Sequence, residues 1–126
     1  MQLVAIAIGG AIGALLRFWI SSGVHSVAGR SFPYGTLTVN VIGSLCIGFL
    51  YVLFNERFEI SVHWRALLMV GMLGALTTFS TFSMETLELL EKRDVVKALL
   101  NVTLNVILCV FAAWIGVLIA RGMETA

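Results

Sequence analysis

Residues 71–85 read GMLGALTTFSTFSME, and this stretch decides how the rest of the chain is interpreted. It begins as an apolar helix, and the seven residues from Thr77 to Ser83 are only hydroxyl residues and phenylalanines. Glu85 follows two residues later. A carboxylate within a membrane segment is costly, so its presence there usually marks a function. We therefore predict that this stretch lines a pathway through a membrane.

The composition of the whole chain is that of a membrane protein. Of its 126 residues, 60% are hydrophobic and 12% are charged, whereas a soluble domain carries about 25% charged residues. The mean hydropathy of +1.01 points the same way. A formal net charge of +1 provides no basic stripe for phosphates, which argues against a nucleic-acid partner. We expect one domain over residues 1–126 at this length.

Four apolar segments are long enough to cross a bilayer as helices, since about 20 residues span its core. We place these spans at about residues 2–22, 35–55, 64–90 and 95–120, with a polar loop before residue 34. The first segment lacks a basic start and three more follow, so we expect a retained span and not a cleaved signal peptide. Cys46 and Cys109 lie inside apolar runs and are expected to be free thiols.

Small residues recur in the first two spans. Gly9 and Gly13 are four residues apart, a spacing that lets two membrane helices approach closely. A thin patch facing lipid is the alternative. Ser44 and Gly48 repeat the pattern in the second span. Arg17 is either an interfacial anchor or a charge at a water-filled mouth.

The positive residues that flank the spans are nearly balanced between the two sides of the membrane. The side of both termini holds three, and the opposite side holds four, or five with Arg17. A Lys/Arg excess in short loops normally sets orientation. A bias this weak permits insertion in both orientations, with antiparallel pairing, and equally a single orientation chosen by the small excess. The residues counted are Arg57, Arg65 and Arg121 on one side and Arg30, Lys92, Arg93 and Lys97 on the other.

The centre of the third span is expected to be irregular. Gly71 and Gly74 precede paired threonines, a combination that predicts a broken or distorted helix. The carbonyls freed by a break must be satisfied in lipid by a cation, a partner helix or water. Phe79 and Phe82 share a helix face, where core packing and pathway lining both remain open.

Polar side chains occur inside the other spans as well. Asn40 in the second span and Asn105 in the fourth each carry amide donors that need partners. They either hydrogen-bond between helices or donate into an anion pathway. The hydroxyls of the third span, in turn, often bond back to the preceding helical turn.

At these residues the chain resembles the Fluc-type (CrcB) fluoride channels of bacteria. The matching features are Gly9, Gly10 and Gly13 followed by Arg17, the GTLTVN run at residues 35–40 with Gly43, and the stretch at residues 71–85. The resemblance covers essentially the whole chain. It implies a passive, selective fluoride channel of the bacterial inner membrane that exports fluoride and is not an enzyme.

The resemblance also implies an all-α membrane protein that forms an antiparallel, dual-topology homodimer with two pores. Phe79 and Phe82 match phenylalanines whose ring edges meet fluoride, and Asn40 matches a pore amide. The carbonyls of Gly74 and Thr77 match the positions that hold a structural sodium ion at the dimer centre. The other implied pathway residues are Arg17, Ser80, Thr81, Glu85 and Asn105, the last of which forms, with Asn101 and Cys109, the spacing of a polar track.

A small dual-topology multidrug exporter also has four spans and is the alternative interpretation. Its coupling would depend on a carboxylate in the middle of the first span, where this chain has no acid. A purely structural membrane subunit would not need the run of hydroxyls and phenylalanines. These differences favour the fluoride channel.

Overall fold

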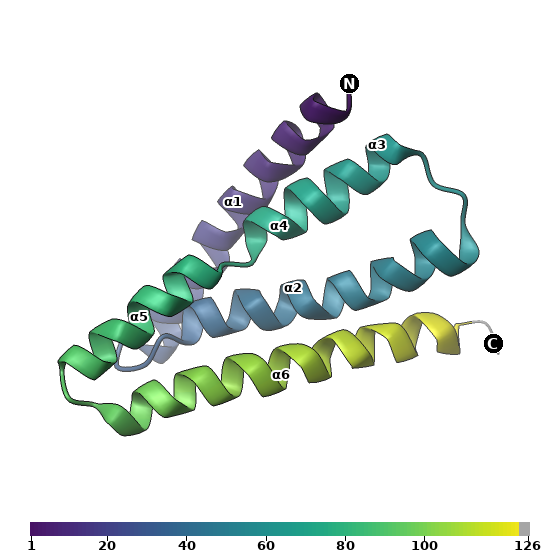
Figure 1. The fold of residues 1–126 in the computed structure, drawn as a ribbon. Helices are drawn as coiled ribbons and strands as arrows, with labels where there is room; N and C mark the ends of the chain where they lie inside the picture. Colours follow the sequence, from purple (N-terminus) through teal and green to yellow (C-terminus); the bar gives the residue numbers. More distant parts are fainter. Residues whose placement is uncertain (124–126) are drawn as a thin grey trace.

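The computed structural model describes residues 1–123, and every regular element in that part of the chain is helical (Figure 1). Four helical stretches are long and apolar enough to cross a membrane: Gln2–Ala28, Tyr34–Arg57, Val62–Glu91 and Val95–Gly122. The prediction of an all-helical chain with four apolar spans is therefore confirmed. The elements are α1 (Gln2–Ala28), α2 (Tyr34–Val52), η1 (Leu53–Arg57), α3 (Val62–Arg65), η2 (Ala66–Leu73), α4 (Gly74–Leu76), α5 (Phe79–Glu91) and α6 (Val95–Gly122), where η marks a π-helical segment.

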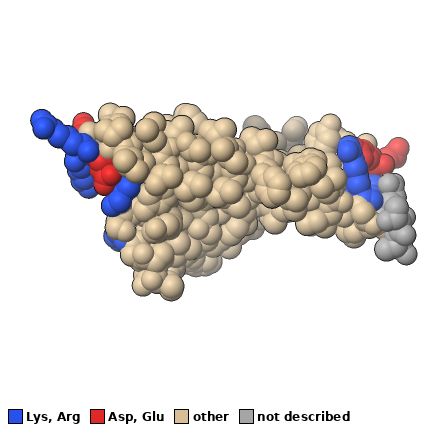
Figure 2. Space-filling model, turned by 90° about the horizontal axis from the view of Figure 1, so that it is seen from below, with Lys and Arg blue, Asp and Glu red and all other residues tan. Residues whose placement is uncertain are grey.

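The helices cross the molecule from end to end. The start of α1, the end of α6 and the connection between η1 and α3 lie at one end, and the turns that join α1 to α2 and α5 to α6 lie at the other (Figure 1). Lys, Arg, Asp and Glu gather at the two ends, with a wide band of other residues between them on the face seen in Figure 2. This distribution suits a protein whose ends meet water and whose middle meets lipid.

The first helix is longer than the predicted span of residues 2–22, because it continues to Ala28. Two serines of the expected loop form hydrogen bonds inside the helix. Ser21 Oγ donates to the Arg17 carbonyl at 2.6 Å, and Ser26 Oγ donates to a carbonyl three residues earlier at 2.7 Å. Gly29 ends the helix with φ +83°, a conformation that favours glycine. The connection to α2 is shorter than expected for this reason.

Two glycine-lined crossings hold the spans together. Gly9 and Gly13 are buried where α1 crosses η2, and a Cβ at either would overlap a backbone carbonyl, of Leu67 and Met72 respectively. The predicted helix contact is confirmed, and the lipid-facing alternative is not realised.

The second crossing joins α2 to α6, which run side by side in Figure 1. A Cβ at Gly48 would overlap the Ala113 carbonyl, and one at Gly116 would overlap the Leu45 carbonyl. Gly48 is thus a helix contact, whereas Ser44 lines a groove described below. Cys46 and Cys109 are both free, as the sequence predicts.

Candidate functional site

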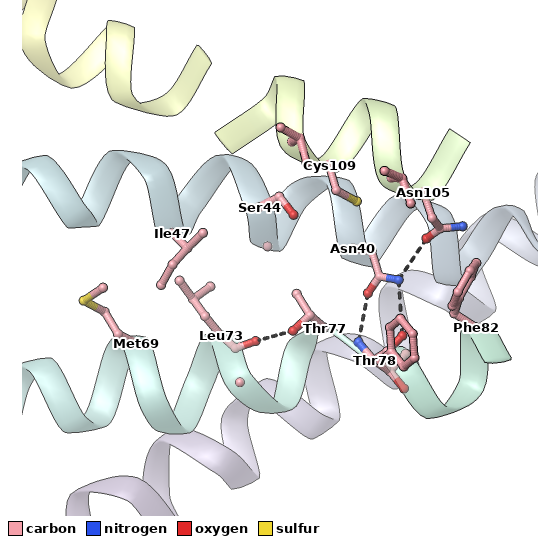
Figure 3. A pocket seen from close by; sticks show the side chains of 15 residues that line it. Asn40, Ser44, Ile47, Met69, Leu73, Thr77, Thr78, Phe82, Asn105 and Cys109 are labelled. Atoms are coloured by element: carbon pink, nitrogen blue, oxygen red, sulfur yellow. Dashed lines mark hydrogen bonds between the residues drawn. The ribbon is translucent and has the colours of Figure 1, made fainter. Parts of the chain in front are cut away.

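A groove of about 500 Å³ opens between α2, the third span and α6 (Figure 3). Its floor is apolar, and its polar atoms gather where α4 gives way to α5. The polar or sulfur-bearing side chains that line it belong to Asn40, Ser44, Met69, Thr77, Thr78, Asn105 and Cys109. The remaining lining residues are glycines, aliphatic residues and the two phenylalanines Phe79 and Phe82.

The helical conformation of the third span is interrupted at Thr77 and Thr78. Both residues have extended backbone, with ψ 156° at Thr77 and φ −151° at Thr78. The Thr77 amide and hydroxyl both donate to the Leu73 carbonyl at 3.1 Å, which closes the last turn before the interruption. Thr78 Oγ1 accepts from the Thr81 amide at 3.2 Å and so caps the start of α5.

The Asn40 side chain, on the neighbouring helix α2, forms the hydrogen bonds that the backbone of the interrupted segment lacks. Its Oδ1 accepts from the Thr78 amide at 2.8 Å, and its Nδ2 donates to the Thr78 carbonyl at 3.2 Å (Figure 3). In an uninterrupted helix the Thr78 amide would point at the Gly74 carbonyl four residues earlier. A side-chain amide therefore takes the place of the helical partner and fixes the extended residues.

Asn40 also joins α2 to α6. Its Nδ2 donates to Asn105 Oδ1 at 3.0 Å, so both amide hydrogens of Asn40 are engaged. Asn105 Nδ2 donates to the carbonyl and to Oδ1 of Asn101, at 2.8 and 3.0 Å. Of the two interpretations of Asn40 and Asn105, the geometry realises hydrogen bonding between helices. A donor role toward an anion stays a prediction.

The two phenylalanines lie together but differ in burial. Their ring centroids are 5.3 Å apart with an interplanar angle of 53°. The Phe82 side chain is 9% exposed, whereas Phe79 is 78% exposed. Core packing within the chain can thus explain Phe82 and not Phe79, since an aromatic ring left this exposed has no core around it.

The groove unites some of the predicted pathway residues and leaves others apart. Asn40, Phe79, Phe82, Asn105, Gly74 and Thr77 line it. Ser80 and Thr81 lie on the exposed face of α5, although their hydroxyls stay within 3.4 and 3.0 Å of Thr78 Oγ1. Arg17 lies half-buried on α1. These three residues are outside the groove lining.

Glu85 lies three residues beyond Phe82 on α5 and is also outside the groove. Its Oε1 is buried and makes no hydrogen bond within the described part of the chain. The Thr36 side chain and the His25 ring lie near it. The carboxylate therefore faces the junction of α1, α2 and α5 at the end of the bundle.

Sequence reasoning missed Thr78 and Ser44 as individual site residues. Thr78 supplies the cap and both backbone partners of Asn40. Its signal was its position directly after Thr77 in the hydroxyl run. Ser44 follows Asn40 by four residues, which places both on one helix face.

These features define the class of the protein as a multi-pass, four-span helical membrane protein with a polar groove at an interrupted helix. The family follows from the sequence comparison. Residues 4–117 match the family described as CrcB-like protein, Camphor Resistance (CrcB). The chain belongs to this family.

Curated relatives support this placement. A protein of Methylococcus capsulatus is 54% identical over 123 residues, which cover 98% of this chain and 54% of that protein. Relatives from Hydrogenovibrio crunogenus and Magnetococcus marinus are 46% and 47% identical over 93% and 96% of this chain, and 89% and 98% of their own lengths. All three are named fluoride-specific ion channel FluC, which is the name of a channel and not of an enzyme. The chain spans about half the length of the Methylococcus relative.

Proposed function

We propose that this chain forms a passive, selective fluoride channel in the bacterial inner membrane. The observation that carries the proposal is the groove at Thr77 and Thr78, where hydroxyls and two phenylalanine rings converge in the middle of an apolar span. The names of the curated relatives supply the ion. The first span, α1, carries no Asp or Glu, whereas a multidrug exporter would need a carboxylate in the middle of that span.

The chemistry of the groove suits a small, strongly hydrated anion. Fluoride must exchange its water for fixed donors in a narrow path, with binding weak enough for release. Hydroxyl groups provide such donors, and phenylalanine ring edges carry the positive end of the aromatic quadrupole. Phe79 and Phe82, 5.3 Å apart, would present two such edges in succession. Asn40, Ser80, Thr81, Asn105, Glu85 and Arg17 are the further polar residues proposed along the path.

The proposal includes an antiparallel homodimer with two pores. In a single chain the groove is open and Phe79 is 78% exposed, so a second copy is needed to enclose the path. The weak charge bias allows both orientations to insert. Adding two lysines to one side should lock the orientation and abolish activity, and coexpression of oppositely locked chains should restore it. Full activity of a singly locked chain would contradict the antiparallel arrangement.

We also propose a structural sodium ion at the centre of the dimer. The residues present fit such an ion, because Thr78 directs its amide to Asn40 and leaves the Gly74 carbonyl without its usual helical donor. Gly74 is exposed in the single chain, and Thr77 beside it is extended. Carbonyl oxygens at an unwound helix suit a hard monovalent cation. Two such carbonyls from each chain would surround one point.

Export follows from the membrane potential, which is negative inside and drives an anion outward by about 2.3 kcal/mol per 100 mV. The decisive experiment uses liposomes that contain only this purified chain and are loaded with fluoride. We expect an ion-selective electrode to record fluoride release on addition of a potassium ionophore, and no comparable release of chloride. Release equal to that of protein-free liposomes would overturn the channel proposal.

Exhaustive removal of sodium tests the structural ion separately. We expect it to lower both fluoride efflux and dimer stability, and readdition of sodium to restore them. Efflux and stability that are indifferent to sodium would leave the channel proposal intact and remove the ion from it.

A further inference from the structure

A one-way series of hydrogen bonds starts at Thr78, the residue that caps α5, passes through α2 and α6, and returns to α5. We infer that its last two side chains, Asn101 and Thr86, are positioning residues that hold Phe82 at the groove. Neither side chain is proposed to contact the conducted ion. Its consequence for conduction rests on the proposed function, whereas the positioning itself rests on contacts within the chain.

The first part of the series crosses three helices. The Thr78 amide donates to Asn40 Oδ1 at 2.8 Å. Asn40 Nδ2 donates to Asn105 Oδ1 at 3.0 Å, and Asn105 Nδ2 donates to Asn101 Oδ1 at 3.0 Å. Each amide thus accepts at its oxygen and donates from its nitrogen in the same direction.

The second part returns to α5. Asn101 Nδ2 donates to Thr86 Oγ1 at 2.9 Å, and Thr86 Oγ1 donates to the Phe82 carbonyl at 2.8 Å. The series therefore begins at the cap of α5 and ends on the carbonyl of Phe82, one turn further along the same helix. The segment that carries both phenylalanines lies between its two ends.

The direction of the series is fixed by chemistry. A backbone N–H can only donate and a carbonyl can only accept, so the two ends dictate the orientation of every amide between them. Turning any one amide around would set two donors or two acceptors face to face. Hydrogen bonds aligned in this way also polarise and strengthen one another in a low-dielectric interior.

Because Asn101 is buried, the end of the series at Asn101 and Thr86 is sensitive to the loss of a hydrogen-bond partner. Asn101 is 0% exposed, so water cannot replace a lost partner of its amide. Phe82 is the one side chain of α5 that is buried in the described chain, and α5 has little apolar packing of its own. A threonine hydroxyl that only bonds back to its own helix has little effect on neighbouring residues. The Thr86 hydroxyl also accepts a hydrogen bond from α6, so the position of Phe82 along the groove depends on it more strongly.

The test replaces Thr86 with valine, which keeps the shape of the side chain and removes the hydroxyl. Thr86→Ser retains the hydroxyl and serves as the conservative variant. Thr38→Val is the matched control, because Thr38 Oγ1 also donates to a carbonyl four residues earlier, at 2.7 Å, without joining another helix in the described chain. Each variant carries para-fluorophenylalanine at position 82, and its ¹⁹F NMR signal is recorded in detergent alongside thermal stability and liposome efflux.

We expect Thr86→Val to shift or broaden the signal from position 82 and to slow fluoride efflux about tenfold, the equivalent of one buried hydrogen bond. Thr86→Ser and Thr38→Val should leave both unchanged. An unmoved signal in Thr86→Val, with or without a lower melting temperature, would overturn the inference, because a merely structural hydroxyl produces that result. If the signal moves as expected but the unsubstituted chain releases no fluoride, the positioning role stands and the proposed function fails.

Discussion

The two halves of the third span are held in place by different forces. The first half, η2 and α4, packs on α1 through backbone-to-backbone contact at Gly9 and Gly13. The second half, α5, is fixed mainly by hydrogen bonds from Asn40 and Asn101. Close packing tolerates no added volume, whereas directed hydrogen bonds tolerate volume and require particular atoms. The two halves should therefore fail under different substitutions.

The largest effect is expected at the glycine crossing. In Gly13→Val the new Cβ would overlap the Met72 carbonyl, and backbone atoms on both helices would have to move. We expect no folded, monodisperse protein on size-exclusion chromatography. Gly10→Val is the matched control, since a Cβ at Gly10 meets nothing within 4 Å. Normal elution of Gly13→Val would show that the crossing is looser than the structure has it.

The next largest effect is expected at Asn40. Asn40→Leu keeps the branched shape and the number of side-chain heavy atoms, but it removes both bonds to Thr78 and the bond to Asn105. We expect a loss of about 3 kcal/mol in the free energy of unfolding, because the buried polar groups left behind find no new partners. Denaturation in detergent measures this loss. A change below about 1 kcal/mol would mean that the interruption at Thr77 and Thr78 needs no side-chain support.

Substitutions of the two phenylalanines distinguish an effect on packing, measured as stability, from an effect on conduction, measured as fluoride efflux. Phe82→Ile should cost about 1–3 kcal/mol in stability because Phe82 is buried, while Phe79→Ile should cost less than about 0.5 kcal/mol in the isolated chain. Both should slow fluoride efflux sharply while the dimer still assembles, because isoleucine lacks the ring quadrupole. Unchanged efflux in both variants would remove both rings from the ion path and leave Phe82 with a packing role alone.

The smallest effect is expected at Thr77. Thr77→Val removes a hydroxyl that donates to the Leu73 carbonyl, which the Thr77 amide already reaches at 3.1 Å. We expect a change of about 0.5 kcal/mol or less in stability and an unaltered sodium requirement, because the backbone carbonyls stay in place. A sodium requirement that disappears in Thr77→Val would assign the ion to the hydroxyl and not to the carbonyls.

The sequence predicts the glycine packing of the first half of the third span better than the hydrogen bonds that hold the second half. Apolar length locates the spans, and the spacing of Gly9 and Gly13 predicts the close crossing, because both signals are local. The partner of Asn40 could not be predicted, since Asn105 is 65 residues away and meets it only through the crossing of α2 and α6. The extension of α1 to Ala28 was missed because serines satisfied by their own helix look the same in sequence as serines in a loop.

The two glycine crossings join the first span to the third and the second span to the fourth. Neighbouring spans along the chain are thus not the ones in closest contact, and the pairs are interleaved. As the chain leaves the ribosome, α1 and α2 enter the membrane before either has its glycine partner. The closest packing can begin only when η2 emerges, and it is finished only by α6. The packing between spans is therefore complete only after the last span has been synthesised, and a chain truncated before Ala113 would enter the bilayer without the partner of Gly48.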